Sequence, residues 1–115
     1  MTVLPELTIM SSSAGDAVTV VVRGEVDLAT APQLRDELLD HILGGSSELR
    51  LDLQGVSFMD SAGLHVLIAS QRRAALMGGG LVLARTSKPV DRLLEVTGAA
   101  RLFERGTAPG LLTAR

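Results

Sequence analysis

The fold is decided by the stretch Leu49-Arg50-Leu51-Asp52-Leu53-Gln54-Gly55-Val56-Ser57-Phe58-Met59-Asp60-Ser61-Ala62-Gly63-Leu64. Its leucines alternate with polar residues up to position 54, which is the period of a strand with one apolar face. A helical period follows and predicts one apolar side made of Leu64, Leu67, Ile68, Gln71 and Ala75. Asp60 and Ser61 therefore lie where the predicted strand ends and the predicted helix begins. The first turn of a helix has unpaired N–H groups, so a hydroxyl placed there can cap the helix or carry a phosphate.

A hairpin is predicted upstream of this stretch. Residues 7–13 alternate loosely, and residues 17–23 include a β-branched run of the kind that favours strands. Only the short segment Ala14-Gly15-Asp16 separates them. A turn of that length predicts that the two strands pair antiparallel.

The first helix is predicted to begin at Thr30. Thr30 and Gln33 have the spacing of a capping box, and Pro32 suits a first helical turn. Gly44-Gly45 ends the helix. The residues predicted to form its buried stripe are Ala31, Leu34, Leu38 and Ile42.

Three more elements are predicted after the central helix, which runs to Met77. A short apolar strand covers residues 81–84, and Ser87 caps a third helix that Gly98 closes. Leu102-Phe103 suggests a last edge strand. The order β-β-α-β-α-β-α implies a mixed sheet, because helical crossovers give parallel neighbours while the opening hairpin is antiparallel.

Composition narrows the classes of function. The 115 residues are 46% hydrophobic, with two Phe and no Trp or Tyr, so the core must be aliphatic. Phe58 and Met59 are candidates for exposed partner contacts or for the core, and Phe58 is expected in the core because aromatic residues are so few. A net charge of −2 and the scarcity of aromatic rings argue against direct nucleic-acid partners. Zero cysteines, no membrane-length apolar run and no signal-like N-terminus favour a cytoplasmic chain without membrane insertion.

Catalytic and metal sites find little support. Ser61-Ala62-Gly63 resembles half of a nucleophile elbow, but Met59 stands where that motif needs a glycine. A contact between Ser61 and His65 is open at i,i+4 spacing, although His65 is expected to face solvent. Two histidines without ligand spacing predict no metal site, and no cofactor is expected. A small serine hydrolase is the alternative from another class.

Two acidic residues, Asp27 and Asp60, lie in strand-to-helix connections. Such connections share one edge of a sheet with parallel strands, so both carboxylates can gather near Ser61. Alternatively, each Asp hydrogen-bonds the backbone of its own turn. The residues leave both interpretations open.

At Asp60-Ser61-Ala62-Gly63-Leu64 the sequence resembles the STAS domain family, and specifically the bacterial anti-sigma factor antagonists. The segments 24–27 and 51–61 resemble the family's segment before the first helix and its central strand and loop. The later segments 81–83 and 90–103 match as well, so that the resemblance covers about residues 5–105. It implies a single α/β domain over residues 1–115, with a mixed sheet, helices mainly on one face, and a loosely ordered tail at 106–115.

The resemblance also implies a switchable, non-enzymatic binding module. In this family the dephosphorylated antagonist binds an anti-sigma factor, often one with serine kinase activity, and so frees a sigma factor that regulates transcription. Phosphorylation of the serine that matches Ser61 breaks the contact, and a phosphatase reverses the change. The residues expected at the partner contact are Asp27, Thr30, Asp60, Ser61, Ala62, Gly63 and Leu64.

The family leaves one alternative open at the same fold, a STAS scaffold or a subunit of a transport complex without a sigma pathway. Some relatives have a second hydroxyl where this chain has Ala62, so Ser61 is the only hydroxyl of the turn. Gly63 is expected to let a partner's backbone approach closely, although the geometry of a helix start explains a glycine equally well.

Overall fold

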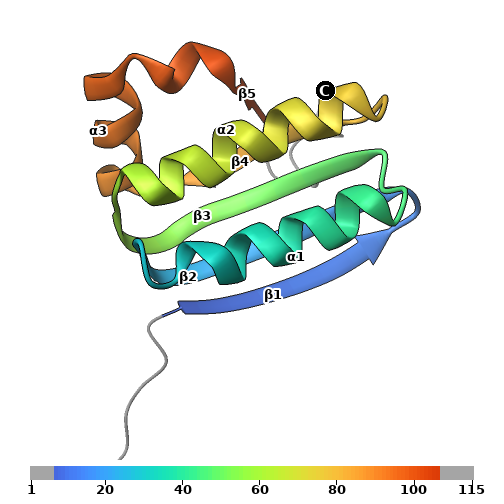
Figure 1. The fold of residues 1–115 in the computed structure, drawn as a ribbon, viewed down its shortest axis with the longest axis horizontal. Coiled ribbons are helices and arrows are strands. Elements are labelled where there is room, and N and C mark those ends of the chain that lie inside the picture. Colours follow the sequence, from blue (N-terminus) through green and yellow to red (C-terminus); the bar gives the residue numbers. More distant parts are fainter. Residues whose placement is uncertain (1–6, 107–115) are drawn as a thin grey trace, which may run out of the picture.

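A five-stranded sheet forms the centre of the structure, a computed structural model that describes residues 7–106 (Figure 1). The strands lie in the order of the sequence: β1 (Leu7–Ala14), β2 (Ala17–Val26), β3 (Glu48–Met59), β4 (Gly80–Thr86) and β5 (Glu104–Arg105). Strand β1 pairs antiparallel with β2, and every other neighbouring pair is parallel. The predicted opening hairpin and the mixed sheet are therefore confirmed.

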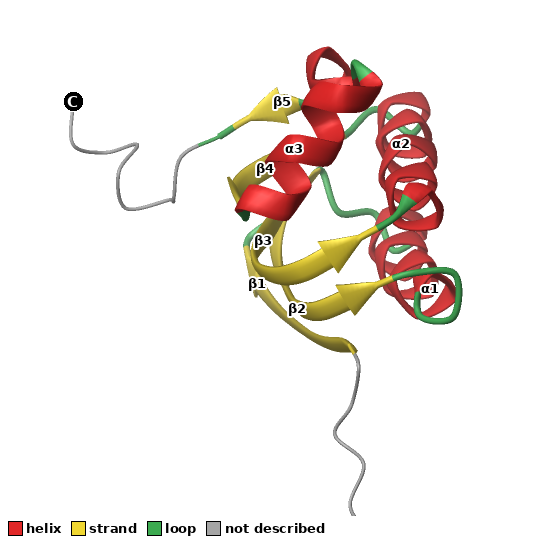
Figure 2. Ribbon diagram, turned by 90° about the vertical axis from the view of Figure 1, so that its left-hand side faces the viewer, coloured by secondary structure: helices red, strands yellow, loops and turns green. Residues whose placement is uncertain are grey.

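Three α-helices connect the strands: α1 (Ala31–Leu43), α2 (Ser61–Leu76) and α3 (Lys88–Thr97). Helices α1 and α2 lie side by side on one face of the sheet, as Figures 1 and 2 show from two directions. Helix α3 contacts β3 and continues into the short 3₁₀ helix η1 (Ala99–Leu102). The expected placement of helices mainly on one face holds for α1 and α2.

The core between the helices and the sheet is aliphatic, as the composition requires. Strand β3 contributes Leu49, Leu51 and Leu53, and the predicted stripe of α1 is buried at all four positions. The largest fully buried side chains are Leu34, Leu38, Leu49, Leu51, Leu53, Leu67, Leu83, Leu94, Val20, Val22, Val26 and Val56. Phe103, at the end of η1, is buried in the same cluster.

Strand β3 is longer than the alternation of its leucines predicts. It continues through Gly55 to Met59, and its pairing with β2 shifts register between Val21 and Arg23 and again between Gly24 and Glu25. These irregularities change which residues face the core, so that Val56 and Met59 are buried while Phe58 is 47% exposed. The expectation that Phe58 lies in the core is wrong.

The buried face of α2 is rotated from the predicted one. The residues that face the core are Gly63, Leu64, Leu67, Ser70 and Ala74, whereas Ala75 is exposed. Three of these, Gly63, Ser70 and Ala74, are small residues that a pattern of large hydrophobic side chains does not identify. Small side chains on that face let the helix axis approach its neighbours closely.

The end of the chain follows the prediction with one shift. Ser87 accepts a hydrogen bond from the Val90 N–H, and Gly98 closes α3 in the left-handed region at φ 73°. Leu102-Phe103 is not the last strand, which is β5. Apart from Gly106, the predicted tail at 106–115 lies outside the described residues. No helix within residues 7–106 is long and apolar enough to span a membrane.

Candidate functional site

The carboxyl ends of β2 and β3 bring two loops together. The backbone N–H of Asp60 donates to the Val26 carbonyl at 3.1 Å, which ties the start of α2 to the end of β2. The segment that leads to α1 begins at the next residue, Asp27. Parallel neighbouring strands therefore place the two acidic loops at one edge of the sheet, as predicted.

Asp60 caps helix α2. Its Oδ1 accepts hydrogen bonds from the backbone N–H groups of Ala62 at 2.9 Å and Gly63 at 3.2 Å. The carboxylate also lies at the positive end of the helix dipole, which favours its charge. With these N–H groups satisfied by Asp60, Ser61 is left as an exposed first residue of the helix.

The loop before α1 is organised by Asp27 and Thr30 together. Asp27 Oδ1 accepts from the N–H groups of Ala29 at 2.9 Å and Thr30 at 3.0 Å. The Thr30 hydroxyl donates to the Glu25 carbonyl at 2.8 Å and accepts from the Asp27 N–H at 2.9 Å. The predicted capping box of Thr30 with Gln33 is wrong, because the Thr30 side chain points back along the loop and forms no cap bond.

Asp27 and Asp60 thus both hydrogen-bond the backbone of their own loops while lying at the same sheet edge. The two interpretations that the sequence left open are compatible. Turn chemistry fixes each carboxylate, and the sheet places both beside the start of α2.

Gly63 and Leu64 seat α2 against the sheet. A Cβ built on Gly63 would lie 2.7 Å from Val26 Cγ1 and 2.7 Å from Met59 Cγ. Leu64 is only 7% exposed. The space beside Gly63 is therefore filled by this chain's own side chains, and the close approach that the glycine permits is that of β2 and β3. A partner contact by Gly63 or Leu64 stays a prediction.

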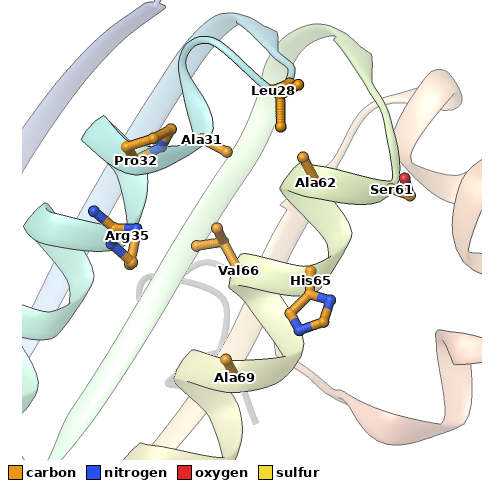
Figure 3. A pocket seen from close by; sticks show the side chains of 9 residues that line it. All are labelled: Leu28, Ala31, Pro32, Arg35, Ser61, Ala62, His65, Val66 and Ala69. Atoms are coloured by element: carbon orange, nitrogen blue, oxygen red, sulfur yellow. The ribbon is translucent and has the colours of Figure 1, made fainter.

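A groove of about 440 Å³ runs between the first turns of α1 and α2 (Figure 3). We call it the α1–α2 groove. It lies beside Ser61 and is mainly apolar, with Leu28 at its rim and 79% exposed. Its lining residues are Leu28, Ala31, Pro32, Arg35, Ser61, Ala62, His65, Val66 and Ala69.

Residues 9–105 match a protein family described as "Mlab, STAS domain". The chain belongs to the STAS domain family. Two curated relatives are named anti-sigma-B factor antagonist. The Bacillus subtilis protein is 37% identical over 87 residues, which cover 76% of this chain and 79% of that protein. The Listeria monocytogenes protein is 35% identical over 89 residues, which cover 77% and 78%.

Solved structures share the STAS fold. An anti-sigma factor antagonist from Mycobacterium paratuberculosis superposes with a TM-score of 0.81 and 26% identity, covering 94% of this chain and 92% of that one. The anti-sigma factor antagonist SpoIIAA in its unphosphorylated form has a TM-score of 0.76 at 20% identity, covering 91% and 93%. Its phosphorylated form, from Bacillus, has a TM-score of 0.71 at 19% identity, covering 91% and 96%.

The hydrolase alternative finds no support in this STAS domain. Within residues 7–106, neither the Ser61 hydroxyl nor the exposed His65 ring forms a hydrogen bond, so no base is positioned on the serine. The antagonists that the chain resembles are regulatory binding proteins and not enzymes.

The sequence patterns did not predict Leu28 at the rim of the site, whereas Phe58 was considered as an exposed contact and placed in the core. Leu28 and Phe58 are large, exposed and attached to the ends of β2 and β3. The sequence does contain an indication that Leu28 is exposed. It is a single leucine among short or polar loop residues, and no strand or helix periodicity places it on a buried face.

Proposed function

We propose that this STAS domain is an anti-sigma factor antagonist that binds an anti-sigma factor with serine kinase activity and is switched off by phosphorylation of Ser61. The observation that carries the proposal is the position of Ser61. Its hydroxyl is exposed at the first residue of α2, beside an apolar groove, in a chain 35–37% identical to anti-sigma-B factor antagonists.

The contact with the partner is proposed to centre on Ser61 and Ala62, with Leu28 as an apolar anchor. Exposed apolar patches with polar rims are typical of protein interfaces. Asp27, Thr30 and Asp60 hold the two loops in shape through the hydrogen bonds described above. Gly63 and Leu64 fix the angle at which the helix start presents Ser61.

Phosphorylation transfers the γ-phosphoryl group of ATP to Ser61 Oγ and releases ADP and the hydroxyl proton. It breaks no hydrogen bond of the described fold, because the Ser61 hydroxyl makes none. The phosphate adds about −1.5 to −2 charges next to the carboxylates of Asp60 and Asp27. The phosphate would repel an acidic partner surface, and burying it against an apolar surface would cost its hydration. The complex is therefore lost while the fold of this domain is kept. A phosphatase restores the serine by hydrolysis of the phosphate ester.

The partner is thus a protein, with no direct nucleic-acid contact and no membrane insertion, and the place of action is the cytoplasm. The exchange of partners controls transcription indirectly through a released sigma factor. The SpoIIAA structures show that the same fold exists in that protein both without and with phosphate.

The test is calorimetric binding to the anti-sigma kinase candidates of the source organism. Unmodified protein and Ser61→Ala should bind with similar affinity, whereas protein with phosphoserine installed at position 61 should bind at least about tenfold more weakly. Ser12→Asp is the matched control, since Ser12 is also exposed but lies on β1. Kinase-dependent incorporation of phosphate that Ser61→Ala abolishes completes the evidence. Absence of both binding and phosphate would favour a scaffold or transport-complex subunit.

A further inference from the structure

Two cationic or titratable side chains face the α1–α2 groove near Ser61. His65 lies one turn further along α2, and Arg35 reaches the groove from α1 (Figure 3). His65 is exposed and forms no hydrogen bond or ion pair with the described part of the chain. Among residues 7–106, Arg35 pairs only with its neighbour Asp36, at 3.2 Å between Nε and Oδ1, where both side chains are more than half exposed. Exposed pairs of this kind are weak, so the Arg35 guanidinium is free to move.

A phosphate on Ser61 would find few free donors at the start of α2. The N–H groups of Ala62 and Gly63 already donate to Asp60 Oδ1. That carboxylate, together with Asp27 in the adjacent loop, also repels a phosphate dianion. The side chains further along the groove are therefore the additional partners that a phosphate dianion can reach.

We propose that His65 holds the phosphate of phosphorylated Ser61, with Arg35 as a second and weaker cation. The inference rests on the proposed function, because it concerns the regulation of the same site. Residues at i and i+4 of a helix are neighbours on its surface, so the His65 ring is within reach of the phosphate oxygens. Hydrogen bonds between ionised partners are the strong ones. The phosphate is then drawn along α2 and across the mouth of the groove.

This placement has a consequence for the switch. A phosphate that points into solvent would only add charge at the rim of the α1–α2 groove. A phosphate held by His65 also covers the part of the groove between Ser61 and Val66. The modified serine then blocks the apolar contact as well as repelling an acidic one.

The test uses full-length protein in which phosphoserine is installed at position 61 during translation, so that no kinase is needed. The titration of the phosphate is followed by ³¹P NMR between pH 5 and 8. Replacing His65 by glutamine (His65→Gln) should raise the midpoint of the second phosphate ionisation by about 0.5 pH unit relative to the unmutated phosphoprotein. Arg35→Gln should raise it by less. His65 is exposed, so His65→Gln should leave the unfolding curve unchanged.

His41→Gln is the matched control, because it removes the other histidine, which lies in the last turn of α1 and contacts Ser11 and Glu37. Its phosphoprotein should titrate like the unmutated one. An equal midpoint for the His65→Gln and unmutated phosphoproteins would overturn the inference, and so would a shift produced by Arg35→Gln alone. Either result leaves the proposed function standing, since binding and kinase assays decide that separately.

Discussion

Gly63 and Val26 are packed so closely that no side chain fits between them: a Cβ on Gly63 would lie 2.7 Å from Val26 Cγ1 and 3.2 Å from the Val26 carbonyl oxygen. The contact joins the first turn of α2 to the last residue of β2. It fixes how Ser61, two residues earlier, is presented at the edge of the sheet.

Gly63→Ala is therefore expected to destabilise the domain by about 1–3 kcal/mol, because the added methyl group overpacks a buried contact. Gly80→Ala is the control, since no atom of the described residues lies within 4 Å of a Cβ at that position. Urea unfolding followed by circular dichroism measures both. Equal stability of Gly63→Ala and the unmutated protein would show that α2 can shift away from the sheet without cost.

Asp60→Ala is expected to cost about 1 kcal/mol, because the Ala62 and Gly63 N–H groups lose their acceptor. Asp60→Asn retains a side-chain oxygen at the same place and should lose much less. Thermal or urea unfolding of the two variants separates the hydrogen bonds from the charge. Equal losses in both would mean that the negative charge, and not the cap, stabilises the helix start.

The order of strands and helices could be predicted from the sequence because local signals agreed with tertiary packing. The stripe of α1 is buried as its period predicts, and Ser87 and Gly98 bound α3 as their residue types predict. Where local preference and the global fold agree in this way, the elements can be predicted from the sequence.

The errors arose where specific hydrogen bonds or strand pairing, and not the local residue pattern, decided the outcome. Thr30 has the spacing of a capping box, but its hydroxyl donates to the Glu25 carbonyl and accepts from the Asp27 N–H instead. Phe58 was expected in the core because the chain has so few aromatic residues. It is 47% exposed instead, in the part of β3 where register shifts interrupt the pairing with β2, and only the pairing reveals these shifts. The α1–α2 groove is lined by residues from two helices, and no local sequence pattern predicts a surface that two helices share.

A pH effect is expected from the cluster of Ser11, Glu37 and His41, which joins β1 to α1. The Ser11 hydroxyl donates to Glu37 Oε2 at 2.7 Å, and His41 Nε2 lies 3.0 Å from the same oxygen. These contacts, the Ser11 hydrogen bond foremost, hold the pKa of Glu37 below its ordinary value of 4.5. The folded state therefore favours the ionised carboxylate. Its contribution is present above pH 4.5 and is lost as the pH falls through the lower folded-state pKa.

Glu37→Gln should flatten that part of the stability profile. Because the Glu37 side chain is 37% exposed, the effect is small, on the order of a few tenths of a kcal/mol. Urea unfolding at pH 3, 4, 5 and 7 measures it, with Asp40→Asn as a control on the same helix. A profile for Glu37→Gln that parallels the unmutated one would show that this cluster does not contribute to acid stability.

Leu28→Ser should weaken binding to the proposed anti-sigma partner about tenfold while leaving the fold intact. Leu28 is 79% exposed, so losing its side chain removes little buried area from the free protein. In a complex, however, an apolar anchor at the rim of the groove would be withdrawn from water, and a buried leucine contributes about 1.5–3 kcal/mol. Leu76→Ser is the matched control, because Leu76 is 85% exposed but lies at the opposite end of α2 from Ser61. Calorimetric titration of the partner with both variants, beside their urea unfolding curves, separates interface from fold. If the two variants bind equally well, Leu28 is no anchor, and the contact must centre on the exposed first turn of α2 alone.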